Sequence, residues 1–367
     1  MSLLWTDQCF LGMLLLSLFL ILRSLKKAHV KHEFQRLFQQ PLAVCSGIVL
    51  LFFLIIGTLD SIHFMSSVKE NNSETIHKER ISVLDKLVAP LGQTYEKTYS
   101  APLALTLYST ETSWINGKIE QIYARLLYPP TTLTDANKYT LIKKILIWTL
   151  AVSSLVVLAL LGLYCLLSRQ KNRWSLCVGA AFLSVFFCLF FVIASYWLSR
   201  YFHLFGTGKI GEDIFYYTIK SIRTGLIIGT LTTVLTLPLA IVLGLSAGYF
   251  NGVVDDIIQY IYITLSSIPG VLLITASVLS MQTYIANHPL QFSTLEQSSD
   301  ARLFMLCIIL GVTSWTNLCR LLRAEALKFN NIDFVVAAKA LGTGSFRILH
   351  KHLLPNVMPI ILITVVL

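Results

Sequence analysis

The string Gly206-Thr207-Gly208-Lys209 has the residue types of a phosphate-binding loop, in which backbone amides and a lysine hold phosphate oxygens. A complete loop also needs a glycine separated from the Gly-Lys pair by four residues, and a Ser or Thr directly after the lysine. His203 and Ile210 occupy those two positions. The sequence therefore predicts that this chain does not itself bind a nucleotide.

Other residues that could do chemistry are scattered along the chain. His63, His77 and His203 have no carboxylate or nucleophile at a spacing typical of a catalytic site. The seven cysteines all lie in or beside apolar stretches, and none belongs to a Cys-x-x-Cys pair. We therefore expect no catalytic residue, no metal site, no disulfide framework and no cofactor, so that the chain is not an enzyme.

The elements around these residues are apolar and long. The 367 residues are 55% hydrophobic and only 13% charged, whereas a soluble domain carries about 25% charged residues. Runs of roughly 20 apolar residues are long enough to cross a bilayer. We expect spans at Cys9–Leu22, Leu42–Thr58, Ile145–Ser168, Trp174–Leu198, Gly225–Ala247, Ile257–Leu279 and Leu303–Leu318, with an eighth beginning at Asn356. Since the sequence stops inside this last run, we also expect it to be truncated at its C-terminus.

Basic residues indicate the orientation of these spans. Three clusters, around Lys26, Lys171 and Lys339, fall on the same side when the spans alternate. Cytoplasmic loops are enriched in Lys and Arg, so we expect these clusters in the cytoplasm and residues 60–144 outside. The net charge of +10 is then a topology signal, and we expect no nucleic-acid partner.

The first apolar stretch, Cys9–Leu22, allows two interpretations. A cleavable signal peptide carries basic residues before its apolar run, whereas the charges here follow it. We therefore favour a retained helix over a signal peptide.

The segment Asp333–Pro355 has the pattern of a short helix–turn–helix between two spans. Asp333 is predicted to cap a first helix over Phe334–Leu341. Gly342 is predicted to end that helix in the left-handed conformation. Ser345 is predicted to cap a second helix, which Pro355 limits.

This helix–turn–helix is expected to meet a partner. Its first helix is rich in alanine, and Ala337 and Ala338 leave a surface that another protein can approach closely. Arg347, His350 and Lys351 place basic groups on the second helix. A membrane protein with such a module on one face is expected to be moved by that partner.

One predicted span is interrupted. The string Ser266-Ser267-Ile268-Pro269-Gly270 lies midway along Ile257–Leu279. Irregular backbone at membrane depth is tolerated where it is buried in protein or lines a watery path. Two interpretations stay open: an ordinary kink, or a break at which Ser266, Ser267, Pro269 and Gly270 line a transport pathway.

From His203 onward the chain resembles the permease subunits of peptide-type ABC importers, the C-type oligopeptide and dipeptide group. FGTGKIGEDIFYYTIKSIRTGLIIGTL is similar to the family's G-T-D-x-x-G-x-D segment, and FVVAAKALG followed by HLLP is similar to its cytoplasmic loop. Val336 stands in place of the Glu of the loop pattern E-A-A-x-x-x-G. The pattern's remaining positions match Ala337, Ala338, Gly342, Leu354 and Pro355.

The resemblance implies an all-α, polytopic membrane protein with the type I ABC importer permease fold and an external soluble insertion. It implies residues 1–59 as N-terminal membrane helices, 60–144 as a periplasmic segment and 145–198 as an inserted hairpin. Residues 199–367 would form the permease domain, with an ATPase-coupling loop at 320–355.

The resemblance also implies the partners: ABC ATPase subunits, a second homologous permease and a periplasmic solute-binding protein, all acting at the inner membrane. The substrate stays open among peptides, nickel, heme and peptide antibiotics. Two other functions are weighed against this one. A membrane scaffold or sensor would explain residues 60–144 but not the helix–turn–helix, and an ion-coupled carrier is disfavoured because the predicted spans contain no ionisable residue.

Overall fold

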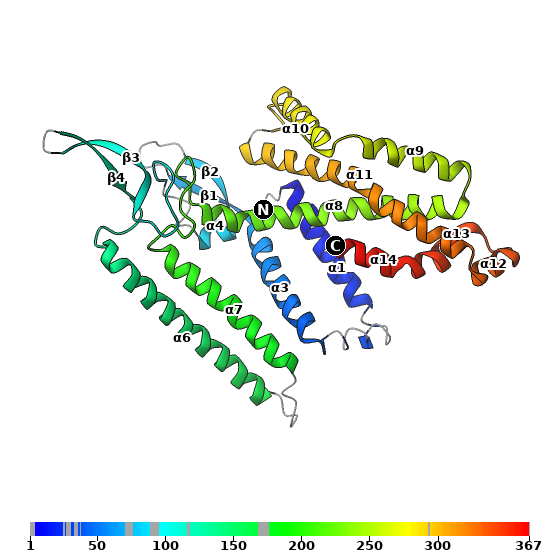
Figure 1. The fold of residues 1–367 in the computed structure, drawn as a ribbon, viewed down its shortest axis with the longest axis horizontal. Helices are drawn as coiled ribbons and strands as arrows, with labels where there is room; N and C mark the ends of the chain where they lie inside the picture. Colours follow the sequence, from blue (N-terminus) through cyan, green and yellow to red (C-terminus); the bar gives the residue numbers. More distant parts are fainter. Residues whose placement is uncertain are drawn as a thin grey trace. The chain divides into compact units, whose positions relative to one another are not determined.

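The computed structural model is mostly helical (Figure 1) and describes residues 4–24, 26, 31–32, 36, 38–69, 76–88, 95–115, 118–167, 176–292 and 294–366. The chain divides into two compact units. The first contains residues 13–225, and the second contains residues 226–367 together with residues 4–12. Helix α1 (Trp5–Ser24) and helix α8 (Ile214–Phe250) each contribute to both units.

Three long apolar helices dominate the first unit. They are α3 (Pro41–Ser61), α6 (Asp135–Leu167) and α7 (Leu176–Ser199), and α7 packs against both of the others (Figure 1). Pro41 opens α3, where its missing N–H costs no hydrogen bond. The apolar side chains suit a membrane because a helix satisfies every backbone group within itself.

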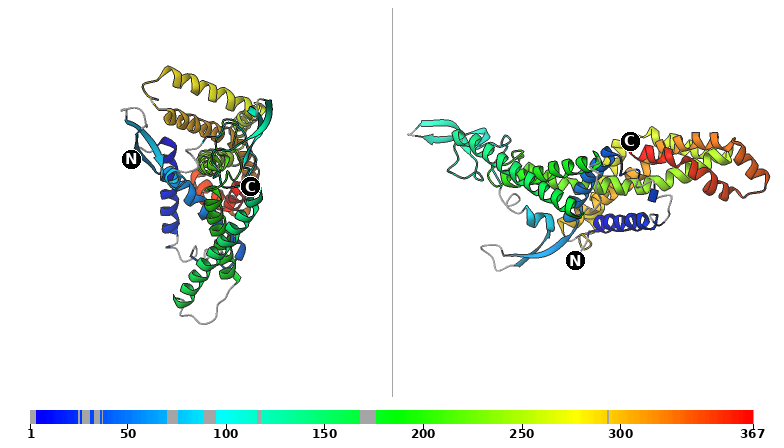
Figure 2. Two further views of the ribbon diagram at one scale, coloured as in Figure 1. Left: turned by 90° about the vertical axis from the view of Figure 1, so that its left-hand side faces the viewer. Right: turned by 90° about the horizontal axis from the view of Figure 1, so that it is seen from below.

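Strands occur, within the described residues, only as two hairpins in the segment between α3 and α6. Strand β1 (His63–Lys69) pairs antiparallel with β2 (Ile76–Ser82), and β3 (Thr106–Ile115) pairs antiparallel with β4 (Lys118–Arg125). Figure 2 shows that the two hairpins are separate. A short helix, α4 (Val83–Leu87), follows β2 and begins with a capping box between Ser82 and Asp85.

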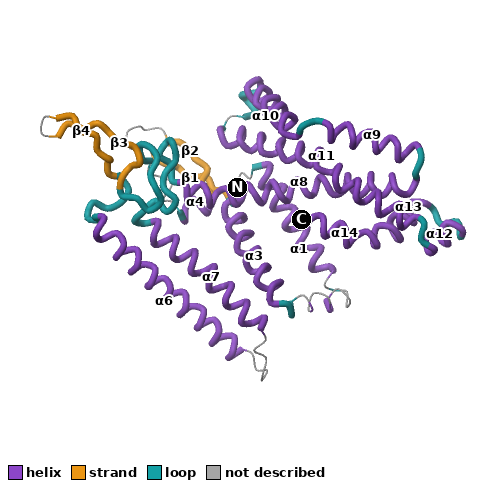
Figure 3. The backbone as a smooth tube through the Cα atoms, viewed as in Figure 1, coloured by secondary structure: helices purple, strands orange, loops and turns teal. Residues whose placement is uncertain are grey.

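The second unit is built from the rest of α8 and the helices that follow it (Figure 3). These are α9 (Val253–Ser267), α10 (Gly270–Asn287), α11 (Leu295–Asn330), α12 (Asp333–Ala340), α13 (Ser345–Ile348), the π-helical turn η1 (Leu349–Leu353) and α14 (Leu354–Val366).

Small residues let α8 and α11 pack closely in the second unit. A Cβ atom on Gly244 would lie 2.8 Å from the Cys319 carbonyl oxygen, and one on Gly248 would lie 2.5 Å from the Ala326 Cβ. Glycines four residues apart on one helix face are typical of membrane helices whose backbones approach closely. Every larger side chain at Gly248 would push the two helices apart.

The structure confirms the predicted fold class, and most of the predicted spans form long apolar helices. Seven described helices are long and apolar enough to cross a membrane: α1, α3, α6, α7, α8, α10 and α11. The predicted span Ile257–Leu279 is wrong as one element, because α9 ends at Ser267 and α10 begins at Gly270. The basic residue Lys171, used above for orientation, lies outside the described residues.

Candidate functional site

The predicted helix–turn–helix is present, but its first cap is not the one expected. Helix α12 contains Asp333 as its first residue, and Ile332 occupies the N-cap position without a side-chain hydrogen bond. The prediction of Asp333 as N-cap is therefore wrong by one position. A carboxylate in the first turn still stabilises the helix, because it faces the positive end of the helix dipole.

The end of α12 confirms the prediction for Gly342. Its φ angle is +73°, and its N–H donates to the Lys339 carbonyl at 3.0 Å. The Thr343 N–H donates to the Ala338 carbonyl at the same distance. These two bonds form a Schellman motif, which requires a left-handed residue at the position of Gly342.

The second helix differs from the prediction at both of its ends. Gly344, not Ser345, is the N-cap residue of α13. Pro355 does not end the helix, because α13 continues through η1 into α14 and Pro355 lies in the first turn of α14. A proline ring inside a regular α-helix clashes with the carbonyl four residues earlier. The wider π-helical turn directly before Pro355 relieves that clash.

One face of α12 is buried against its own chain. Val335 and Ala338, three residues apart and therefore on one side of the helix, pack into the apolar core of the second unit together with Ile348, Leu353 and Val357. Ala338 is only 8% exposed. The structure thus separates the two alanines that the sequence treated alike: Ala338 is a packing residue, whereas Ala337 is exposed.

The opposite side of the helix–turn–helix exposes large apolar side chains. Leu341 is 86% exposed and Phe346 is 82% exposed, and Val336 beside Ala337 is half exposed. Arg347, His350 and Lys351 are also exposed. Sequence reasoning missed Leu341 and Phe346, although each is an apolar residue within two positions of a turn glycine. We call Val336, Ala337, Leu341 and Phe346 the apolar tip.

Polar contacts fasten this module to two long helices of the second unit. The Lys339 ammonium lies 4.9 Å from the ring centroid of Tyr249, the penultimate residue of α8. Lys339 also donates to Oδ1 of Asn330 at the end of α11, and Asn330 donates to the Tyr249 carbonyl oxygen at 3.3 Å. These three residues connect α12, α8 and α11.

A bidentate ion pair joins the start of α9 to α11. Arg323 donates through Nη2 to Asp255 Oδ2 at 2.6 Å and through Nε to Oδ1 at 2.5 Å. The Arg323 guanidinium holds the pKa of the Asp255 carboxyl below its usual value. Planar, two-point pairs of this kind fix orientation as well as distance.

The interrupted span contains a full break rather than a kink. Between α9 and α10 only Ile268 and Pro269 are non-helical, and Pro269 is the N-cap residue of α10 (Figure 3). Ser266, Ser267, Pro269 and Gly270 are all exposed. The Ser267 hydroxyl donates to the Thr264 carbonyl at 2.7 Å, so that its oxygen is still able to accept from a solute.

The phosphate-loop-like string serves as a packing loop in the first unit. Gly206 has a φ of +76°, and a Cβ there would lie 2.2 Å from the Ser100 carbonyl oxygen. Gly211, with a φ of +81°, meets the Glu96 backbone in the same way. Both glycines are required because the loop lies directly on residues 96–101.

His203, whose sequence spacing pointed to no carboxylate partner, has two carboxylates beside it in space. His203 Nδ1 lies 2.6 Å from Asp213 Oδ2, and its Nε2 lies 3.6 Å from Glu96 Oε1. Glu96 also accepts from the Leu127 and Tyr128 amides. All three ionisable side chains are almost fully buried, so no substrate can reach them. The cluster therefore fastens the segment around Glu96 to the start of α8, where Asp213 accepts from the first amides of the helix.

These features define a class of protein. A bundle of apolar helices, with a close-packed helix–turn–helix between two of them, is the architecture of a helical membrane permease. Residues 240–367 match the family described as binding-protein-dependent transport system inner membrane component. Over this region the chain is similar to inner-membrane permease components, and its long apolar helices are those of a multi-pass membrane protein.

Curated permeases are similar to part of the chain. It is 30% identical over 165 residues to the oligopeptide transport system permease protein OppC of Bacillus subtilis, covering 45% of this chain and 48% of the relative. The dipeptide permease DppC of the same organism is 28% identical, with 45% and 46% covered. The glutathione permease GsiD of Pectobacterium atrosepticum is 27% identical over 154 residues, with 42% and 45% covered. The chain thus spans about half the length of the relatives it matches.

Proposed function

We propose that this chain is a permease subunit of an ABC importer and forms part of the translocation pathway for peptides or related small solutes. The apolar tip carries the proposal. Leu341 and Phe346 are more than four-fifths exposed on a well-packed module that belongs to the matched family region. Exposed apolar groups of this kind on a structured surface mark contact sites for another protein. The names of the relatives, which are oligopeptide, dipeptide and glutathione permeases, support the substrate class.

The partner at the apolar tip is proposed to be a separate ATPase subunit in the cytoplasm. Residues 60–144 would then face the periplasm, where a solute-binding protein delivers substrate, and a second permease would complete the pathway. In this arrangement α6 and α7 form an inserted hairpin that leaves the orientation of α8 unchanged. Ser266, Ser267, Pro269 and Gly270 are proposed to line the pathway, since the break between α9 and α10 frees backbone groups there.

The contacts around α12 suggest how movement is transmitted. An ATPase that displaces α12 would act on α8 and α11 through Lys339, and on α9 through Arg323. The buried contacts of Val335 and Ala338 make α12 move together with α14. The module is therefore suited to act as a rigid lever rather than as a flexible loop.

A matched pair of leucine substitutions tests this function. Leu341→Asp places a charge on the apolar tip, whereas Leu290→Asp places the same charge on a leucine that is 96% exposed between α10 and α11. A charge that is desolvated without a partner at an interface costs several kcal/mol. We expect both variants to reach the membrane at normal levels. Only Leu341→Asp should lose the co-purifying ATPase and the uptake of labelled peptide.

The outcomes separate the candidate functions. Retention of the ATPase by Leu341→Asp would place its docking surface elsewhere. Uptake that continues without any ATPase and follows the proton gradient would favour an ion-coupled carrier. Normal peptide uptake in cells that lack the chain altogether would favour a scaffold or sensor.

A further inference from the structure

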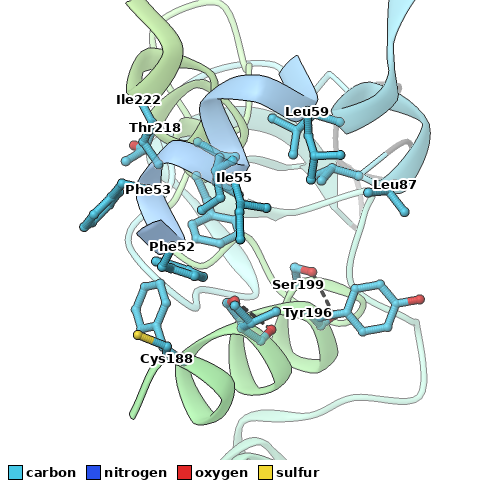
Figure 4. A pocket seen from close by; sticks show the side chains of 18 of the residues that line it. Phe52, Phe53, Ile55, Leu59, Leu87, Cys188, Tyr196, Ser199, Thr218 and Ile222 are labelled. Carbon is cyan, nitrogen blue, oxygen red and sulfur yellow. Dashed lines mark hydrogen bonds between the residues drawn. The ribbon is translucent and has the colours of Figure 1, made fainter. Parts of the chain in front are cut away.

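A cavity of about 850 Å³ lies within the first unit, between α3 and α7. Figure 4 shows Phe52, Phe53 and Leu59 of α3 on one side of it and Cys188 and Tyr196 of α7 on the other. Helix α4 and the first turns of α8 also line it. Ligand pockets in proteins typically measure about 300–1,000 Å³, so the volume suffices for a sizeable ligand.

The walls of the cavity are almost entirely apolar. Phe187 and Phe191 of α7 are more than half exposed and line it, as do Ile55 and Phe53 of α3. An apolar cavity of this kind offers water too few hydrogen-bond partners to hold it. In a bilayer, the molecules available to fill such a space are hydrocarbon chains.

One end of the cavity is polar and carries a cation. Arg200, directly after α7, lines it together with Tyr196 and Ser199. Its guanidinium donates to the Tyr196 hydroxyl at 2.8 Å and lies 5.1 Å from that ring centroid. Within the part of the chain that the structure describes, Arg200 has no carboxylate within 4.0 Å. Its charge is therefore available to an anionic ligand.

Aromatic residues place this end of α7 at the membrane surface. Trp197 contacts Trp148 of α6 with ring centroids 5.0 Å apart, and Arg200 lies 5.6 Å from the Trp197 ring. Trp and Tyr are enriched at the level of lipid headgroups. The polar end of the cavity is thus expected at the depth of lipid phosphates, with the apolar walls at the depth of acyl chains.

We propose that this cavity is a binding site for a phospholipid, whose acyl chain lies between α3 and α7 and whose phosphate is bound by Arg200. Guanidinium groups bind phosphate through paired, charge-assisted hydrogen bonds. The cavity and the cation together match an amphipathic molecule with one anionic end. The bound chain would brace α3 against α7 and against the start of α8.

Photocrosslinking tests this site on the full chain extracted from its own membrane in mild detergent, which removes lipid from exposed helix surfaces. A photoreactive phenylalanine analogue is placed at Phe191 or, as a control, at Phe19, an exposed residue of α1 outside the cavity. Irradiation of the extracted protein followed by mass spectrometry identifies the adduct. We expect phospholipid adducts at Phe191 at least several-fold more abundant than at Phe19, whose lipid neighbours are exchanged for detergent. A protein adduct at Phe191 would overturn the proposal, because another helix would then fill the cavity.

Substitutions test the two parts of the site separately. The chain is purified into nanodiscs of phosphatidylethanolamine and phosphatidylglycerol that contain phosphatidylglycerol with a photoreactive acyl chain. Ser195→Trp fills the cavity from α7, whereas Leu183→Trp adds the same bulk on an exposed part of α7 outside it. Arg200→Gln removes the cation at the polar end, whereas Lys209→Gln removes an exposed cation outside the cavity.

Labelling of the cavity-lining peptides of α3 and α7 should fall at least fivefold in Ser195→Trp and stay at the native level in Leu183→Trp. When phosphatidylglycerol is scarce, Arg200→Gln should lower this labelling, whereas Lys209→Gln should leave it unchanged. Equal labelling in all four variants would show that the cavity holds no lipid. These results do not depend on transport, so they stand or fall apart from the proposed function.

Discussion

Lys339 of α12 holds its ammonium group 4.9 Å from the ring centroid of Tyr249 of α8, although the two residues are 90 positions apart in the sequence. The same ammonium donates a hydrogen bond to Asn330 of α11. A cation over an aromatic ring, together with a charge-assisted hydrogen bond, stabilises a contact by about 1–3 kcal/mol. The Lys339 side chain therefore connects α12 to both α8 and α11.

Lys339→Met keeps the aliphatic stem of this residue and removes its charge. We expect normal insertion but loose coupling, with a several-fold lower ratio of peptide taken up to ATP hydrolysed by the assembled transporter in proteoliposomes. Lys351→Met is the control, because Lys351 is exposed on the same module. Equal losses in the two variants would contradict a specific role for the contact with Tyr249.

Adjacent alanines of α12 are expected to respond differently to the same substitution. Ala338→Asp buries an unpaired carboxylate among Val335, Ile348 and Leu353, which costs several kcal/mol. This substitution should lower the amount of protein in the membrane. It should also lower the unfolding temperature, which is measured by thiol labelling of the buried Cys319. Ala337→Asp should leave both unchanged and weaken ATPase binding. Normal stability of Ala338→Asp would show that α12 is not packed as described.

The turn after α12 depends on backbone conformation alone. No atom lies within 4 Å of a Cβ built on Gly342 or on Gly344, but only Gly342 has a positive φ. A β-branched residue in the left-handed region costs about 1–3 kcal/mol. Gly342→Val should therefore lower the unfolding temperature by several degrees, whereas Gly344→Val should change it little. If both variants unfold alike, the Schellman motif is not what stabilises this turn.

Asp85 makes the first unit sensitive to acid. Burial alone would raise the pKa of its carboxyl, but hydrogen bonds from Lys220, Tyr216 and Ser82 outweigh burial and hold the pKa below its usual value. A carboxyl whose pKa is lowered on folding stabilises the fold at pH values above its pKa in the unfolded chain, about 3.9. This stabilisation is lost as the pH falls through the pKa in the folded state. Unfolding temperatures should thus be level from pH 7 to about 5 and drop below about pH 4.

Asp85→Asn provides the test of this acid sensitivity. The variant should be less stable at neutral pH, since it loses charge-assisted hydrogen bonds worth about 1.5–3 kcal/mol each. Its further loss of stability below pH 4 should be smaller than that of the native chain. Asp135→Asn, at an exposed position in the first turn of α6, is the control and should keep the native pH profile.

The sequence by itself determined what depends on local composition and local backbone geometry. Membrane-spanning helices can be predicted from composition, because a bilayer requires about 20 apolar residues per span whatever the tertiary packing. Gly342 was predictable for a similar reason, since only glycine adopts the left-handed conformation at little cost. The helix caps failed by one residue at Asp333 and Ser345, because several neighbouring residues can supply the same backbone geometry.

Only the tertiary structure decided which side chains meet. Ala337 and Ala338 are identical in type, and their different exposure depends on the packing of α12 against residues near Ile348 and Leu353. His203 meets Glu96 across more than one hundred residues, and no local spacing announces that contact. The cavity beside Arg200 likewise combines α3, α4, α7 and α8. Such contacts depend on how distant segments pack together, which local propensity does not encode.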